Sequence, residues 1–181
     1  MRALASTGLL ALLLAGSQTG CALVSPLPTW ELVKAAGAAT STAIAYGPGR
    51  AVNTVHHGDA PPRSVCIEYN REVQMADLVP ALQAELRELR ISSRVYSAGT
   101  APPDCETWLR YAASIQWDIP PLAEGYRAYV NAATLSLHKL DGRLIAHSSY
   151  ALDGDLRSSK WASTRRKLAP VVKAVITGFE S

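Results

Sequence analysis

The pattern of apolar and polar positions predicts a small domain of strands and helices that begins at Arg63. Residues 65–68 have the composition of a short strand. Apolar residues then recur at three- and four-residue steps, which predicts an amphipathic helix over about 74–90. Residues 93–96 give a second short strand. Between 109 and 117 apolar and polar residues alternate, so one face of that strand should be buried and the other largely in water.

A hairpin is predicted where Asp-Gly lies between two alternating segments, residues 126–139 and 143–152. A two-residue turn at this point brings two pairs together across the strands, Ser136 with His147 and His138 with Ile145. The same register places four apolar residues on the core face: Leu135, Leu137, Leu144 and Ala146.

Apolar residues from Leu168 to Phe179 repeat at helical spacing, which predicts a C-terminal helix on the same sheet. Pro170 lies inside this pattern and indicates a kink or a late helix start. We therefore expect an α+β fold. Its sheet should be mostly antiparallel, with about five strands in the order βαββββα and two helices packed on one face.

The N-terminus has the order of charges and apolar residues typical of a signal peptide over residues 1–20. Cys21 follows Gln18-Thr19-Gly20, which is similar to the site where lipoproteins are cleaved and lipidated, although an aliphatic residue is usual in place of Gln18. We expect a lipid on Cys21; ordinary cleavage nearby, giving a free periplasmic protein, is the alternative. The absence of aspartate after Cys21 favours the periplasmic face of the outer membrane.

Residues 21–62 are rich in Ala, Gly, Thr and Pro and are predicted to form a lipid-anchor tether that contains one Ala-rich helix. This helix, over residues 29–45, either lies on the membrane or a partner, or is a loosely ordered linker. The sequence Tyr-Gly-Pro-Gly at 46–49 should end it. The α+β domain then covers residues 63–181. Since no later segment is apolar over about 20 residues, we expect the mature chain to be soluble apart from its N-terminus.

Charge and cysteine content narrow the possible partners. The chain has 18 basic and 15 acidic residues; removing Arg2 with the signal peptide leaves 17 against 15, a net charge of +2. This is too small to indicate a nucleic-acid partner.

Once Cys21 is assigned to the lipid, Cys66 and Cys105 remain as an even pair in an oxidising compartment, which predicts a disulfide between them.

Two motifs resemble functional sites, one catalytic and one metal-binding, but both are better interpreted as ordinary residues of the predicted hairpin. Ser136 and Lys139 match the Ser-x-x-Lys box of penicillin-binding enzymes, yet residues three apart on a strand point to opposite faces. His138 and His147 are expected to be diagonal neighbours, but no carboxylate or cysteine joins them at ligand spacing. We therefore predict no catalytic residue, no metal ligand and no cofactor, and so no enzyme activity.

Several features together resemble those of a known family. They are the strand with Val65-Cys66-Ile67, the helix after it, Pro103-Asp104-Cys105, Trp117-Asp118, the Asp-Gly hairpin and the final helix. From Ser64 onward, about two thirds of the chain, the sequence resembles a family of uncharacterised small proteobacterial envelope lipoproteins. The resemblance implies an envelope lipoprotein with a Cys66–Cys105 bridge, and it carries over no catalytic residue.

The function expected from these observations is a non-catalytic lipoprotein of the cell envelope. It would be held to the membrane by its lipid anchor and would present its sheet to another envelope protein or to the cell wall. The alternative is an accessory factor for peptidoglycan synthesis or cell division without transpeptidase activity.

Overall fold

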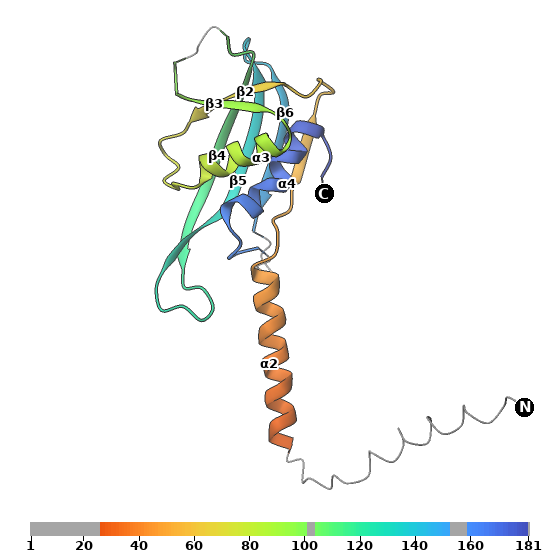
Figure 1. The fold of residues 1–181 in the computed structure, drawn as a ribbon, viewed down its shortest axis with the longest axis vertical. Helices are drawn as coiled ribbons and strands as arrows, with labels where there is room; N and C mark the ends of the chain where they lie inside the picture. Colours follow the sequence, from red (N-terminus) through yellow and green to blue (C-terminus); the bar gives the residue numbers. More distant parts are fainter. Residues whose placement is uncertain (1–25, 101–103, 153–158, 181) are drawn as a thin grey trace, which may run out of the picture. The chain divides into compact units, whose positions relative to one another are not determined.

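The computed structural model of the protein describes residues 26–100, 104–152 and 159–180 (Figure 1). Cys21 and the predicted signal peptide lie outside these residues. The elements are α2 (Pro26–Ala45), β1 (Val52–His56), β2 (Ser64–Tyr69), α3 (Leu78–Glu88), β3 (Ser92–Ser97), β4 (Thr107–Asp118), β5 (Arg127–Lys139), β6 (Leu144–Ala151) and α4 (Thr164–Thr177). The chain divides into two compact units, Met1–Ala39 and Thr40–Ser181.

The described part of the first unit is the greater part of helix α2. The side chains of residues 30–39 are exposed, including those of Trp30, Leu32 and Val33. Lys34 donates a hydrogen bond to Glu31 at 3.2 Å, and its ammonium lies over the Trp30 ring. Among the described helices, α2 included, none is both long and apolar enough to span a bilayer.

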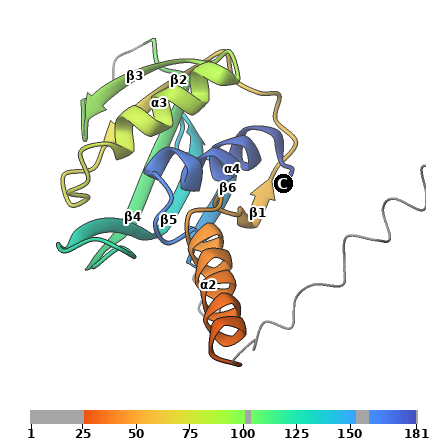
Figure 2. The same ribbon diagram turned by 60° about the horizontal axis from the view of Figure 1, so that its bottom comes forward.

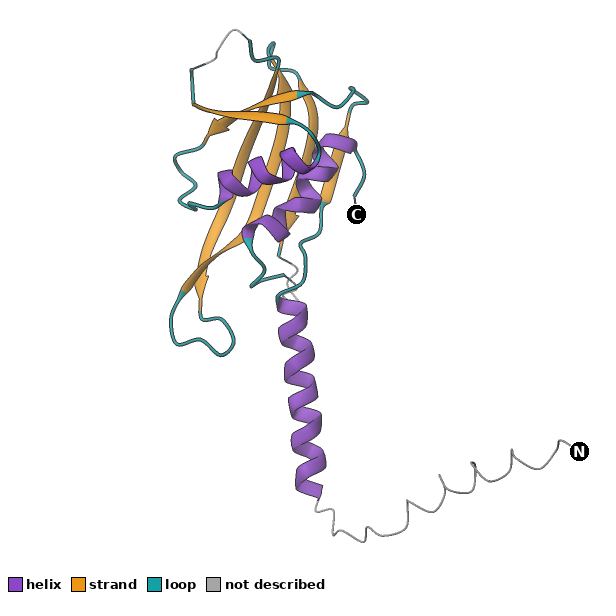
Figure 3. Cartoon of the chain, in the orientation of Figure 1, coloured by secondary structure: helices purple, strands orange, loops and turns teal. Residues whose placement is uncertain are grey.

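The second unit is built on a six-stranded sheet in the order β1-β6-β5-β4-β2-β3. The pairs β1–β6, β6–β5 and β5–β4 are antiparallel, whereas β4–β2 and β2–β3 are parallel. Helices α3 and α4 pack against each other and cover one face of the sheet (Figures 2 and 3). The fold is α+β, with a mixed sheet under one layer of helices.

The predicted sheet was wrong in strand number and in direction. We expected about five mostly antiparallel strands in the order βαββββα, and the structure has six strands in a mixed sheet, with three helices among the described residues. The parallel pairing of β2 with β3 follows from α3, because a helix between two adjacent strands carries the chain back to the end where the first strand started. The missing strand is β1, which lies in the segment assigned to the tether.

Strand β1 escaped prediction because it is short and only half-buried, at the edge of the sheet. Its register against β6 shifts between Val52 and Val55, and Asn53 has a φ of 54°, which interrupts the alternation that identifies a strand. Pairing with β6, almost 100 residues later, therefore decides its conformation more than its own sequence does.

The β5–β6 hairpin confirms the predicted pairing of Ser136 with His147 and corrects the turn. Gly142 adopts a φ of 86°, and Lys139 N–H donates to the Arg143 carbonyl at 2.9 Å, which closes a three-residue loop with a bulge. Consequently His138 pairs with Leu144, not with Ile145. The shift also changes which residue is buried: Leu144, expected in the core, is 38% exposed, whereas Ile145 is only 3% exposed.

Helix α4 starts earlier than predicted and runs through Pro170. Ser163 caps its first turn by accepting a hydrogen bond from Arg166 N–H at 3.3 Å, and Gly178 ends it in a left-handed conformation. Pro170 has no N–H, so the Arg166 carbonyl loses its helical donor. Gly49 N–H donates to that carbonyl instead, at 3.0 Å.

Candidate functional site

The predicted disulfide between Cys66 and Cys105 is present, with 6.2 Å between the two Cα atoms. Its neighbours on β2, Val65 and Ile67, face the main core under the helices, so Cys66 faces the other side of the sheet. There the bridge packs with Trp108, whose ring lies 6.1 Å from that of Tyr96. The bridge thus links β2 to Cys105, which lies just before β4.

Ser136 and Lys139 have different partners, as expected for residues three apart on a strand. The Ser136 hydroxyl lies 3.0 Å from His138 Nε2, whereas Lys139 Nζ lies 3.9 Å from Asp59. The ammonium therefore does not reach the hydroxyl, and the geometry does not support a Ser-x-x-Lys dyad.

Both ring nitrogens of His138 have partners within the hairpin, Ser136 on one side and the Gly142 carbonyl at 3.2 Å on the other. His147 Nε2 lies 3.4 Å from the Ser149 hydroxyl. In the described part of the chain no group of three or more His, Cys, Asp or Glu side chains is arranged to hold a metal. The two histidines are thus accounted for by local hydrogen bonds.

Three consecutive basic residues, 165–167, lie in the first turn of α4 and have three different environments. Arg165 forms ion pairs with Glu85 and Glu88 of α3 and so joins the two helices. Arg166 donates to the Tyr46 carbonyl at 3.4 Å. Lys167 is only 1% exposed. Its position one residue before Leu168 and four before Val171 places it within the apolar stripe of α4, which is the signal that could have revealed its burial.

Lys167 lies at the centre of a cluster of cations and aromatic rings. Its Nζ donates to the carbonyls of Val130 and Lys160, each at 2.8 Å, and lies 5.1 Å from the centroid of the Tyr129 ring. Burial lowers its pKa to about 8, the charges of Arg127 and Lys160 act in the same direction, and the charge of Asp77 opposes them. No carboxylate pairs with this ammonium among the described residues; two carbonyls and the ring faces stabilise it.

Lys160 completes the cluster on the other side of Tyr129. Its side chain is almost fully buried and forms an ion pair with Asp118. The ammonium lies 4.9 Å from the centroid of the Tyr129 ring and 5.1 Å from that of Trp161. Lys160 is thus already neutralised, whereas Arg127, at the start of β5, has an exposed side chain.

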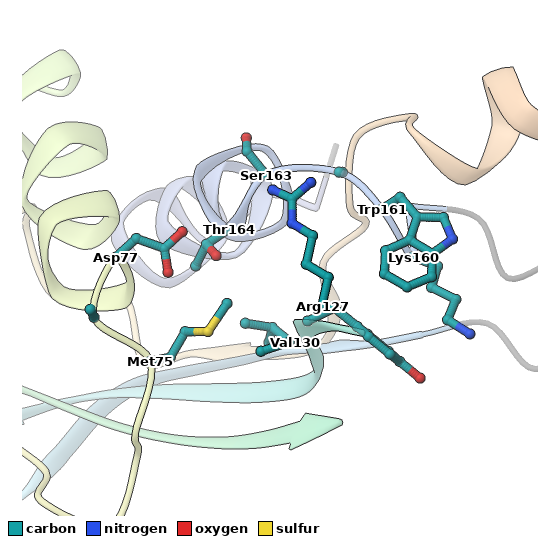
Figure 4. A pocket seen from close by; sticks show the side chains of 12 residues that line it. Met75, Asp77, Arg127, Val130, Lys160, Trp161, Ser163 and Thr164 are labelled. Atoms are coloured by element: carbon teal, nitrogen blue, oxygen red, sulfur yellow. The ribbon is translucent and has the colours of Figure 1, made fainter. Parts of the chain in front are cut away.

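A pocket of about 310 Å³ opens beside this cluster. Three parts of the chain form it: the loop before α3, the start of β5, and the loop that leads into the first residue of α4 (Figure 4). Met75 and Val130 lie between Asp77 on one side and Arg127 on the other. Its volume is at the lower end of the range for small-molecule sites, about 300 to 1,000 Å³. Sequence analysis gave no indication of this site, because its residues come from three separated segments.

The stability of the protein should depend on pH through Lys167. Between pH 8 and 10.5 the unfolded chain holds a proton on this lysine that the folded chain has largely lost, since the folded pKa is about 8 and the ordinary value 10.5. The free energy of unfolding should therefore rise with pH across this window, by up to about 3 kcal/mol. Below pH 8 the lysine is charged in both states, so burying its charge should lower the free energy of unfolding by a constant amount.

Urea unfolding of the wild-type chain and of Lys167→Met at several values between pH 7 and 10.5 measures this effect. Their difference isolates Lys167, because methionine does not titrate. Lys173→Met, which removes an exposed lysine from the same helix, is the matched control and should give a curve parallel to wild type. A parallel curve for Lys167→Met as well would contradict the assignment.

Comparisons with known proteins do not identify a family or a function for the chain. No family model matches the chain, and no curated protein matches it. A similar solved structure is that of a dodecameric PelC variant from Paraburkholderia phytofirmans, which is 18% identical. The match covers 69% of this chain and 98% of that one, with a TM-score of 0.42. At this level the similarity carries no argument for function.

Proposed function

We propose that the chain is an exported, non-catalytic protein of the cell envelope, anchored by a lipid on Cys21, whose α+β domain binds another envelope protein. The observation that carries the proposal is the Cys66–Cys105 disulfide. Thiols in the cytosol are kept reduced, whereas the periplasm forms and preserves disulfides. The apolar segment and small residues before Cys21 agree with export and with lipid attachment.

The open edge at β3 supports a role in binding a protein. No described strand pairs with the outer side of β3, which leaves a row of backbone donors and acceptors for an added strand. Val95 of this strand is 39% exposed. The opposite edge, β1, is less suited, because Thr54 N–H already donates to the Glu180 carboxylate at 2.8 Å and the strand is irregular.

Replacing Cys21 with serine is expected to abolish the anchor without affecting the fold. In cells grown with radiolabelled palmitate, the wild-type chain should be labelled and should fractionate with membranes. Cys21→Ser should carry no label and should move to the periplasmic fraction. Intact-mass measurement of both chains would report the lipid and the disulfide together.

Cys105→Ser serves as the control for this experiment, since it removes a cysteine but leaves the proposed anchor. It should still be labelled, in a smaller amount if the domain is less stable. Finding full-length, reduced protein that begins at Met1 in the cytosol would overturn the proposal. Capture of the mature protein from envelope extracts after cross-linking should then recover a protein partner.

A further inference from the structure

The pocket beside Lys167 has an unpaired charge of each sign on its walls. Asp77 forms no cap hydrogen bond with α3, although it occupies the N-cap position of that helix. In the part of the chain that the structure describes, Asp77 and Arg127 form no ion pair with each other or with any other side chain, although both line the pocket.

The backbone explains why the Asp77 carboxylate is available. An N-cap residue normally adopts an extended conformation, from which its side chain accepts a hydrogen bond from the second or third N–H of the helix. Asp77 has φ −90° and ψ −2°, which is helical, so its carboxylate is turned away from those donors. It lies on the pocket wall opposite Arg127 (Figure 4).

The opposite wall is suited to an anion. Among the described residues Arg127 forms no ion pair; Asp118, which lies opposite it across β4 and β5, pairs with Lys160. Lys167, which is buried and donates to the Val130 carbonyl, adds a further positive charge at neutral pH, and this charge also interacts with Asp77. The first turn of α4 also lines this wall through Ser163 and Thr164, and the unsatisfied N–H groups at a helix start favour negative charge.

We propose that this pocket binds a small zwitterion, a free amino acid or a dipeptide, with its ammonium group on Asp77 and its carboxylate on Arg127. Met75 and Val130 form the apolar floor between the two charges and would contact an aliphatic side chain. Two charged contacts of opposite sign select against simple anions and simple cations, because a ligand with one charge leaves either Asp77 or Arg127 without a partner. This site goes beyond the proposed function and depends neither on export nor on the anchor.

Isothermal titration of the full chain, with its disulfide intact, tests the site with three probes. L-alanyl-L-alanine carries both charges, N-acetyl-L-alanyl-L-alanine only the carboxylate, and L-alanyl-L-alaninamide only the ammonium. The dipeptide should bind, and each blocked form should bind at least about tenfold more weakly, since a charge-assisted hydrogen bond contributes about that factor.

Variants at the two walls should reproduce the effect of blocking the ligand. Asp77→Asn and Arg127→Gln should each weaken dipeptide binding about tenfold or more, and both replace exposed side chains, so the fold should persist. The matched controls Glu106→Gln and Arg87→Gln, exposed and outside the pocket, should bind as wild type. The inference fails if the dipeptide does not bind at 10 mM, if a blocked form binds equally well, or if Asp77→Asn and Arg127→Gln leave binding unchanged.

Discussion

Replacing Cys66 and Cys105 together with alanine is expected to lower the free energy of unfolding by about 4 kcal/mol. The bridge spans 39 residues of sequence, and cross-linking a loop of that length removes roughly this much chain entropy from the unfolded state. The loss is large for one small domain, whose total stability is about 5 to 15 kcal/mol. Both sulfurs are buried, so the alanines also leave a small cavity beside Trp108.

Guanidinium unfolding with and without dithiothreitol measures the effect without relying on the variant alone. The reductant should shift the wild-type midpoint to nearly that of the double variant, and it should leave the double variant unchanged. A wild-type midpoint that does not respond to dithiothreitol, although mass measurement shows both thiols reduced, would show that the bridge does not stabilise the fold.

Features set by local sequence were predictable. Alternation identified β4, β5 and β6, and helical spacing identified α3 and α4, because burial of one face imposes these periods on neighbouring residues. The disulfide followed from counting cysteines, without any knowledge of distance. In the hairpin the pairing of Ser136 with His147 was right, and only the bulge at Gly142 displaced the last pairs.

Features set by distant partners were not predictable. The parallel pairing of β2 with β4 joins strands that α3 and β3 separate in the sequence, and the conformation of β1 depends on its pairing with β6. Asp77 and Arg127, which line the pocket together with Lys160, lie fifty residues apart in the sequence, so nothing in either segment indicates the other. The burial of Lys167 was not predicted either, because a lysine is rarely buried without an acidic partner.

Gly49 and Pro170 illustrate how such a distant dependence arises. Pro170 leaves the Arg166 carbonyl without a donor inside α4, and the segment before β1 supplies one through Gly49. Two more backbone hydrogen bonds hold the same segment, from Ser159 N–H to the Ile44 carbonyl and from Trp161 N–H to the Ala45 carbonyl. The end of α2 is therefore capped by the loop that leads into α4.

Replacing Gly49 with alanine is expected to lower the free energy of unfolding by about 2 to 4 kcal/mol. A Cβ at this position would lie 2.7 Å from the Cα and 2.9 Å from the carbonyl carbon of Lys167, and closer still to its carbonyl oxygen. These are helix backbone atoms, so the segment must lift away and give up the bond to Arg166, adding the loss of a hydrogen bond to the strain of overpacking. Gly125→Ala, where a Cβ meets no atom within 4 Å, is the control and should have little effect.

A double-mutant cycle with Pro170→Ala separates the strain of overpacking from the loss of the hydrogen bond to the Arg166 carbonyl. Alanine at 170 restores an N–H to α4, so the Arg166 carbonyl has a partner even when the segment has lifted. The penalty for Gly49→Ala, measured by urea unfolding, should therefore be about 1 kcal/mol smaller in the Pro170→Ala background than in the wild-type chain. Equal penalties in the two backgrounds would mean that close packing alone, and not the missing donor at Pro170, makes glycine necessary at position 49.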